Sequence, residues 1–422
     1  MLSTIEAVNS VVNNFIWGVP AMICIIGVGL YLSIRTRFLQ IRKFPYSMKV
    51  TLGRMMKKKE ASDGALTPFQ AVCTALAATV GTGNVAGVAG AIAIGGPGAV
   101  FWMWISALLG MCTKFAEVTL AVHFRETNAQ GDLVGGPMYY IKNGLDKKWH
   151  FLAYLFAAFG VLAVFGTGNA TQVNTITTAI DSALSSFNIL PADAVKLVNL
   201  IIGVALAIII ALILIGGIKR IALVTEKIVP IMVIVYLLGT VGVCVMHIDQ
   251  FGAVFSSIFR SAFGMEAVVG GLVGQGVKMA IEMGMKRGVF SNEAGLGSSV
   301  MVHCNSNVKE PVSQGMWGIF SVFTDTIVVC SLTAFTILSS GLFDLQTGRL
   351  AEEFAYLENQ TGSIVGVAFQ ANFGEFGRYF VAIALLLFAF STSLGWSHYG
   401  TKAFEYLFGT CLLYTSDAAD EL

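Results

Sequence analysis

The chain has few charged residues, and this scarcity restricts the class of protein that it can be. Only 12% of its 422 residues are Asp, Glu, Lys or Arg, whereas 55% are hydrophobic. A soluble domain carries about 25% charged residues. With a mean hydropathy of +0.75, the chain cannot present a polar surface on every side. Lipid must therefore be its main solvent, and we expect the bilayer to be its principal partner.

The sequence also lacks the signatures of enzymes and of nucleic-acid-binding proteins. It has only five histidines, and no HExxH, GxSxG or paired intramembrane aspartates. The seven cysteines are scattered without a CxxC spacing, so no metal site is indicated. A net charge of +1 creates no field that favours nucleic acid. We therefore expect no enzymatic activity and no nucleic-acid partner, and infer no obligate protein partner.

What the sequence does have is long apolar runs. A transmembrane helix needs roughly 20 mainly apolar residues, and nine segments meet this requirement. They cover residues 14–34, 68–94, 98–123, 151–180, 196–217, 221–246, 264–284, 314–339 and 378–408. The sequence therefore predicts a multi-pass, all-α membrane protein.

The connecting segments predict the orientation of these spans. The strongest basic cluster lies at 35–59 and should be cytoplasmic. Alternation then places 185–195, 247–262 and 340–376 outside, and the last of these is acidic, as expected. The basic residues placed inside are Lys142, Lys147, Lys148, Lys219, Arg220, Lys286 and Arg287. The simplest interpretation of these side chains is that they anchor helix ends at the interface.

Two of the apolar runs are interrupted by glycine. The second contains "AATVGTGNVAGVAGAIAIGGPG" and the seventh contains "VVGGLVGQGV". Paired broken spans indicate the binding site of a transporter, although glycines also allow close helix packing. In "GTGN" (residues 81–84), two glycines and two side-chain oxygens lie deep in a span, which favours a cavity. We expect the second break near Gly270, Gly271 and Gly274.

Three longer motifs resemble the sodium:alanine symporter family. They are "GGPGAVFWMWISALLGMCTKFAE" (95–117), "RGVFSNEAGLGSS" (287–299) and "FAFSTSLGWSHYG" (388–400). The resemblance implies a leucine-transporter-like helical bundle, an inverted repeat of ten core helices in two sets of five, with broken core helices. It also implies a sodium-coupled symporter that imports alanine, glycine or a similar small neutral amino acid by alternating access. The expected location is the plasma (inner) membrane of a bacterium or archaeon.

This resemblance divides the chain into four parts. Residues 1–65 hold one extra helix and the basic cytoplasmic loop, and residues 66–250 form the first five-helix repeat. Residues 251–410 form an incomplete second repeat of three helices, and 411–422 are an atypical tail. Because "CLLYTSDAADEL" is unlike the family, we expect the sequence to be truncated at its C-terminus.

A helix broken at the bilayer midplane leaves free N–H groups that attract a carboxylate and free carbonyls that bind a cation. By resemblance, the carbonyl of Thr79 and the side chain of Asn84 ligate one sodium ion. The carbonyls of Ala77 and Val80 face a second. The amides of Gly81, Thr82 and Gly83 hold the substrate carboxylate.

The ninth span would complete the second sodium site. Ala389, Thr392 and Ser393 are spaced i, i+3 and i+4 and share one helical face. By resemblance, they offer one carbonyl and two hydroxyl oxygens to sodium. Alternatively, the hydroxyls bond back to the carbonyls four residues earlier.

Four further features have two interpretations each. Gln172 either contacts the substrate or gate, or makes an interhelical hydrogen bond, and Trp396 either lines the pocket or packs. Asp325 is either a cation ligand or proton-linked group, or a buried hydrogen-bond partner. A proton-coupled carrier of another small amino acid is thus the alternative function. "FSNEAGLGSS" is placed at the cytoplasmic end, as an inner gate or turn, with Ser291 as an alternative N-cap.

Overall fold

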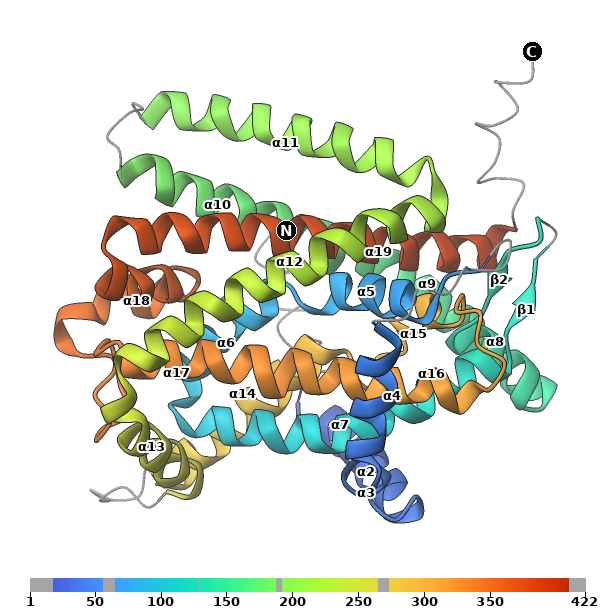
Figure 1. Cartoon of the computed structure of the whole chain (residues 1–422), viewed down its shortest axis with the longest axis horizontal. Coiled ribbons are helices and arrows are strands. Elements are labelled where there is room, and N and C mark those ends of the chain that lie inside the picture. The colour runs from blue at the N-terminus through green and yellow to red at the C-terminus, as the bar shows by residue number, and fades with distance from the viewer. Residues whose placement is uncertain (1–17, 56–64, 129, 187–191, 265–272, 410–422) are drawn as a thin grey trace, which may run out of the picture.

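The computed structural model describes residues 18–55, 65–128, 130–186, 192–264 and 273–409, and helices dominate them (Figure 1). Among these residues, six helical runs are long and apolar enough to cross a membrane, and a bent pair makes a seventh. All seven coincide with predicted spans, which confirms an all-α membrane protein. The predicted span 14–34 is represented by the 17-residue α2 (Val19–Arg35). The span 264–284 begins outside the described residues.

The central bundle consists of long helices, several of which contain an irregular turn. Its first half comprises α5 (Pro68–Thr79), η1 (Gly83–Gly87), α6 (Val88–Gly95), α7 (Gly98–His123), α9 (Phe151–Ala163), η3 (Val164–Ala170), α10 (Thr171–Ser186), α11 (Ala192–Leu214) and α12 (Gly217–Met246). Its second half comprises α14 (Val273–Asn292), α15 (Val300–His303), α16 (Pro311–Val322), η5 (Phe323–Cys330), α17 (Ser331–Ser339) and α19 (Glu375–Phe408).

Short elements cover the ends of this bundle. They are α3 (Leu39–Arg42), α4 (Phe44–Met55), β1 (Glu126–Thr127), β2 (Leu133–Val134), α8 (Pro137–Gly144), η2 (Lys147–Trp149), η4 (Ile248–Gln250), α13 (Phe251–Phe263), η6 (Glu352–Asn359), η7 (Thr361–Ser363) and α18 (Ile364–Phe373). The segments predicted as loops at 35–59, 247–262 and 340–376 thus contain short helices. β1 and β2 pair antiparallel, with Glu126 opposite Val134.

The first core span is a helix broken in its middle. It begins at a capping box, in which the Thr67 hydroxyl accepts from the Gln70 N–H and the Gln70 side chain accepts from the Thr67 N–H. The α-helix ends at Thr79 and helical structure resumes at Gly83, with a bend of 52° between the two halves. The predicted break in "GTGN" is therefore confirmed.

The described part of the seventh span is interrupted later than the predicted break. Gly274 falls inside α14, which continues without interruption to Asn292. Gly270 and Gly271 lie outside the described residues. The helix ends where Glu293 takes a left-handed backbone (φ +54°), and helical structure returns only at Val300. Residues 293–299 therefore interrupt this span within the described part of the chain.

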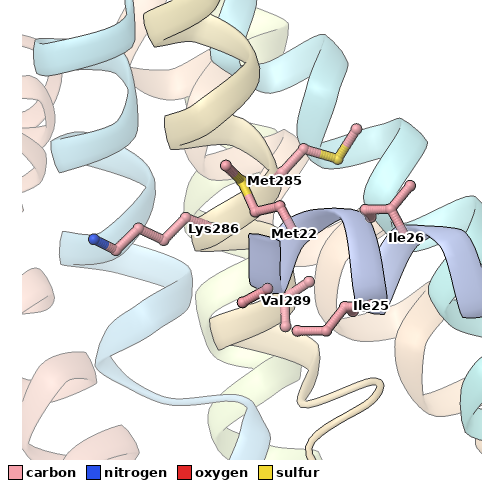
Figure 2. Close-up of a pocket in the computed structure, with 7 residues that line it drawn as sticks. Met22, Ile25, Ile26, Met285, Lys286 and Val289 are labelled. Carbon is pink, nitrogen blue, oxygen red and sulfur yellow. The ribbon is translucent and has the colours of Figure 1, made fainter. Parts of the chain in front are cut away.

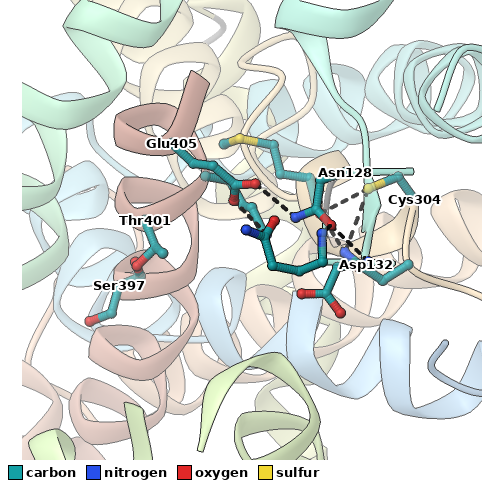
Figure 3. Close-up of polar contacts among 10 residues, drawn as sticks. Asn128, Asp132, Cys304, Ser397, Thr401 and Glu405 are labelled. Carbon is teal, nitrogen blue, oxygen red and sulfur yellow. Dashed lines mark hydrogen bonds and ion pairs between the residues drawn. The ribbon is translucent and has the colours of Figure 1, made fainter. Parts of the chain in front are cut away.

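At the end where α5 begins, several segments are tied together by polar contacts. The Arg125 guanidinium donates to the carbonyls of Cys304, Ser306 and Val308 at 2.6–3.1 Å. Figure 3 shows Asn128 of the β1–β2 hairpin reaching Glu405 on α19, with Nδ2 to Oε1 at 2.9 Å. This end of the bundle is closed by hydrogen bonds between backbone and side chains.

The helices at the edge of the bundle face lipid. In Figure 1, α11 lies along one edge, with α10 and α19 beneath it. The apolar window Leu197–Leu214 of α11 has a mean hydropathy of 3.1, and none of it is buried within the protein. Such a surface is stable only against hydrocarbon.

Close packing at the first break depends on a glycine of α19. A Cβ added at Gly395 would lie 2.6 Å from Ala78 Cβ and 3.0 Å from Ala78 N. We expect Gly395→Ala to destabilise the fold by about 1–3 kcal/mol through overpacking, measured by thermal unfolding in detergent. The matched control is Gly27→Ala on α2, where an added Cβ meets nothing within 4 Å. Equal unfolding temperatures for the two variants would contradict the close approach of α19 to α5.

Candidate functional site

Two π-helical segments and the end of a regular helix meet at the first break. They are η1, the π-helical η5 in the middle of the α16–α17 span, and the end of α14. Turns of π-helix are rare and are frequent at functional sites. The polar side chains at this meeting point are buried, with exposures of 0% for Asn84, 0% for Asp325 and 1% for Ser291.

Asp325 lies at the centre of this polar cluster. Its Oδ1 accepts from Asn84 Nδ2 at 2.7 Å, and its Oδ2 accepts from the hydroxyls of Ser291 and Thr326, both at 2.8 Å. Asn292 Nδ2 in turn donates to the Thr326 hydroxyl at 3.1 Å. Both carboxylate oxygens are therefore satisfied by neutral donors, which makes a buried carboxylate tolerable.

Asn84 connects this cluster to the break itself. Its Oδ1 accepts from the Gly81 N–H at 2.8 Å, which satisfies a donor that the interrupted helix leaves free. Its Nδ2 also donates to the Asp325 carbonyl at 3.1 Å. The amide of Asn84 thus fixes the geometry of residues 81–84 relative to η5. Its Oδ1 has a second lone pair, so it retains the capacity to ligate a cation.

On the opposite side of the break lies α19. The Thr392 hydroxyl donates to the Ala77 carbonyl at 3.2 Å. A Cβ added at Gly81 would overlap the Thr392 hydroxyl, so only glycine fits there. The Ser393 hydroxyl instead bonds back to the Ala389 carbonyl at 3.0 Å, which is the alternative considered from the sequence. Thr392 is thus the member of this face that contacts the break.

Thr79 and Val80 lie where the helix leaves regular geometry. Val80 has φ −77° and ψ 89°, which is not helical. The Thr79 hydroxyl is buried and has no hydrogen-bond partner. A buried oxygen without a partner is costly, so a ligand at this point would be favourable.

Gln172 of α10 and Trp396 of α19 lie near η3, on another side of the break. The Thr82 hydroxyl donates to Gln172 Oε1 at 3.2 Å, although the two residues are 90 positions apart. Trp396 packs over Gly168 of η3, where an added Cβ would lie 2.6 Å from Trp396 Cβ. The structure therefore brings Gln172 to the break. It places Trp396 against η3, the segment that directly precedes α10.

The sequence-based prediction missed Ser291 and Asn292. "FSNEAGLGSS" was placed at the cytoplasmic end, but these two residues lie in the central cluster, and Phe290 Cδ1 lies 3.5 Å from where a Cβ at Gly83 would be. Ser291 lies in the last turn of α14, which ends at Asn292, and it is not an N-cap. The available signal was that "SN" directly follows "GVF", as "GTGN" directly follows "AATV".

A separate pocket between α2 and α14 has a different character. Figure 2 shows Met22, Ile25 and Ile26 of α2 facing Met285 and Val289 of α14, with the Lys286 side chain extending away from them. An apolar lining of this kind offers no groups for the charged ends of an amino acid. We therefore place the candidate site at the break and not in this pocket.

The hydrogen bonds between Asn84 and Asp325 predict a strong energetic coupling. In a double-mutant cycle with Asn84→Ala and Asp325→Ala, we expect an interaction energy of about 1–3 kcal/mol, because each single change leaves the other buried group unpaired. Denaturant unfolding in detergent measures it. Pairing Asn84→Ala with Thr171→Ala, at an exposed position of α10, should be additive to within about 0.5 kcal/mol. Additivity in both cycles would refute the coupling.

The chain resembles known transporters along almost its whole length. The model of the sodium:alanine symporter family matches residues 2–416. "Sodium/alanine symporter AgcS" of Methanococcus maripaludis is 41% identical, with 96% of this chain and 84% of that protein covered. "Probable sodium/glutamine symporter GlnT" of Bacillus subtilis is 33% identical, with 96% and 78% covered.

Among solved structures, a variant of the manganese transporter of Eremococcus coleocola is similar in fold. The TM-score is 0.51 at 12% identity, with 84% of this chain and 68% of that one covered. This likeness concerns the helical fold alone. The sequence matches are far stronger, and the residues that the family model matches include the broken helix and the α19 segment described above. The chain therefore belongs to the sodium:alanine symporter family.

Proposed function

We propose that this protein imports alanine, glycine or a similar small neutral amino acid together with sodium, across the plasma (inner) membrane of a bacterium or archaeon. The observation that carries the proposal is the interruption at residues 80–82, inside the bundle, with buried oxygens on two sides of it. Membership of a sodium:alanine symporter family supports it.

The oxygens around the break are suited to sodium, a hard cation. On the α19 side, the Ala77 carbonyl and the Thr392 hydroxyl already lie 3.2 Å apart. Sodium there would replace their hydrogen bond, and the Val80 carbonyl, the Ala389 carbonyl and the Ser393 hydroxyl are the further ligands that we propose. A second ion would use the Thr79 carbonyl and Asn84, with Asp325 supplying negative charge.

The amino acid would bind between these two positions. The amides of Gly81, Thr82 and Gly83 would hold its carboxylate, because N–H groups at a half-helix N-terminus attract anions. The Gly81 N–H would exchange its hydrogen bond to Asn84 Oδ1 for one to the substrate. Gln172 and Trp396 would limit the size of its side chain. Thr82 and Gln172 are already hydrogen-bonded to each other, which brings α10 close to the break where the substrate side chain would lie. The names of AgcS and GlnT indicate that substrates differ among relatives.

Transport requires that each ligand binds one conformation better than the other. We propose that the two broken helices, α5 with α6 and α14 with α15, are equivalent members of an inverted repeat, 66–250 and 251–410. Sodium would favour the outward-open state, and the amino acid would close the outer side. Release to the inside would follow loss of sodium.

A proton-coupled carrier is the second candidate. It is favoured by one observation, the fully buried carboxylate of Asp325, and one relative is named "Putative sodium/proton-dependent alanine carrier protein YrbD". If protons drive uptake, Asp325→Asn should abolish the pH dependence and the response to a proton ionophore. If sodium drives it, replacing sodium with choline should abolish wild-type alanine uptake into proteoliposomes at every pH tested.

The sodium site on α19 yields a residue-level prediction. Thr392→Val keeps the shape of the side chain but removes one ligand oxygen, so we expect the sodium concentration for half-maximal uptake to rise roughly tenfold. Uptake of radiolabelled alanine at graded sodium concentrations measures it. Thr401→Val is the matched control, because Thr401 lies on the same helix but is exposed (Figure 3). An unchanged sodium requirement in Thr392→Val would refute the assignment.

A further inference from the structure

Arg287 lies on the opposite side of the break from the inner end of α5. It is on α14, one turn before Ser291 of the central cluster. Its Nη2 lies 3.8 Å from the position of a Cβ at Gly90 on α6, and the Thr361 hydroxyl of η7 lies 3.7 Å from the same position. The guanidinium therefore lies between the two broken spans, beside the 340–376 segment.

This placement corrects the predicted orientation of Arg287. The sequence placed Arg287 inside and 340–376 outside, but Arg287 and Thr361 are neighbours of the same glycine. The contacts at the C-terminal end of α6 indicate that this end lies on the outer side of the membrane. Gly96, which follows α6, lies beside Ser261 of α13 and the carbonyl of Gly348. Both of these belong to segments predicted to be outside. Arg287 thus belongs to the outer half of the bundle.

The cation of Arg287 has no counter-charge among the described residues. Its Nε is buried and has no hydrogen-bond partner. The ion pairs of the described chain are Lys142–Glu126, Lys148–Asp146 and Lys402–Glu405, so none includes it. A partly buried guanidinium without a partner in the described part of the chain is costly, and a carboxylate matches its planar fork of donors. This cost is explained if an anionic ligand binds there during function.

Phe290 connects this position with the substrate site. It lies between Arg287 and Ser291 in the chain, and its ring covers Gly83, with Cδ1 3.5 Å from the position of a Cβ there. Because Gly90 and Gly83 are about two helical turns apart, a ligand held at Arg287 would lie two turns from the amides proposed to hold the substrate carboxylate, with Phe290 beside the nearer of them. Displacement of that ring would join the two positions.

We propose that Arg287 is an outer binding residue for the carboxylate of the incoming amino acid, which it holds before the substrate passes Phe290 to the central site. This inference rests on the proposed function, because it takes an amino acid as the substrate. The bidentate geometry of a guanidinium matches a carboxylate, and a fixed positive charge also raises the rate of encounter with one.

The first experiment compares three variants of the full chain in proteoliposomes. In Arg287→Gln, we expect the alanine KM for sodium-driven uptake to rise roughly tenfold, the effect of losing a charge-assisted hydrogen bond. We expect Arg287→Lys to show a smaller rise and Lys278→Gln, at an exposed position of the same helix, to match the wild type. The sodium concentration for half-maximal uptake should stay unchanged in all three. A wild-type KM in Arg287→Gln would overturn the proposal.

A charge-rescue experiment separates binding from a structural role. Arg287→Cys should lose affinity for alanine, a methanethiosulfonate carrying an ammonium group should restore it, and one carrying a sulfonate should not. The same reagents on the wild type control for the native cysteines. Equal effects of the two reagents, or no rescue in a variant that unfolds at the wild-type temperature, would overturn the proposal.

Two further outcomes are distinguishable. If wild-type uptake falls when chloride is replaced by sulfate while Arg287→Gln is insensitive, chloride occupies the site and the carboxylate proposal is overturned. If the wild type shows no sodium-driven uptake of alanine or glycine, the proposed function fails instead. Equilibrium binding of radiolabelled alanine to wild type and Arg287→Gln then still tests the residue: a roughly tenfold weaker affinity supports it, and equal affinity overturns it.

Discussion

The arrangement of the candidate site depends on the hydrogen bonds of one amide, that of Asn84. A helix interrupted in a low-dielectric interior leaves N–H and carbonyl groups whose desolvation is costly. Asn84 offsets part of this cost, because its oxygen accepts from the Gly81 N–H and its nitrogen donates to Asp325. Without that double contact, the simplest way to satisfy the backbone would be to restore the continuous helix. The break is therefore held open by a side chain and not by glycine flexibility alone.

Glycines and small residues then allow other helices to reach the break. Gly81 leaves room for the Thr392 hydroxyl, and Gly395 lets α19 lie against Ala78. On the far side, Gly168 accommodates Trp396. In a bilayer, where lipid is as apolar as a side chain, such close contact is what drives helices together. The residues that permit packing are thus the same ones that bring oxygens to the candidate site, so the two interpretations of the glycine-rich motifs are compatible.

Much of the fold was predictable from the sequence, because the length of a continuous apolar segment decides whether it can cross a membrane as a helix. Seven predicted spans have counterparts of the required length and hydropathy in the described chain. The break at "GTGN" was predictable for a related reason, since polar side chains deep in a span need a cavity or a partner. Hydropathy reports contact with lipid, and it says little about how helices meet one another.

That limit explains the error at "RGVFSNEAGLGSS". Lys286, Arg287 and Glu293 read as the charged boundary of a span, and a boundary suggests a cytoplasmic end. In the structure, Glu293 is only 2% exposed, and its backbone carbonyl accepts from the ammonium of the buried Lys114 at 2.8 Å. A charge buried inside a protein and a charge at the membrane interface look alike in one sequence. The contact that buries Glu293 comes from Lys114 of α7, 179 residues away in the chain.

The interruption at residues 293–299 affects how the two halves of the protein are connected. Asp325 accepts hydrogen bonds from Asn84 beside the first break and from Ser291 beside the second. Neither broken helix can therefore move away from η5 without leaving a carboxylate oxygen short of a donor. Such a loss costs about 1–3 kcal/mol or more for a charged group. A bound cation could replace the missing donor, which lowers the cost of movement only when the ion is present. A shared buried carboxylate would thus be a physical means for an ion bound at one helix to control the position of the other.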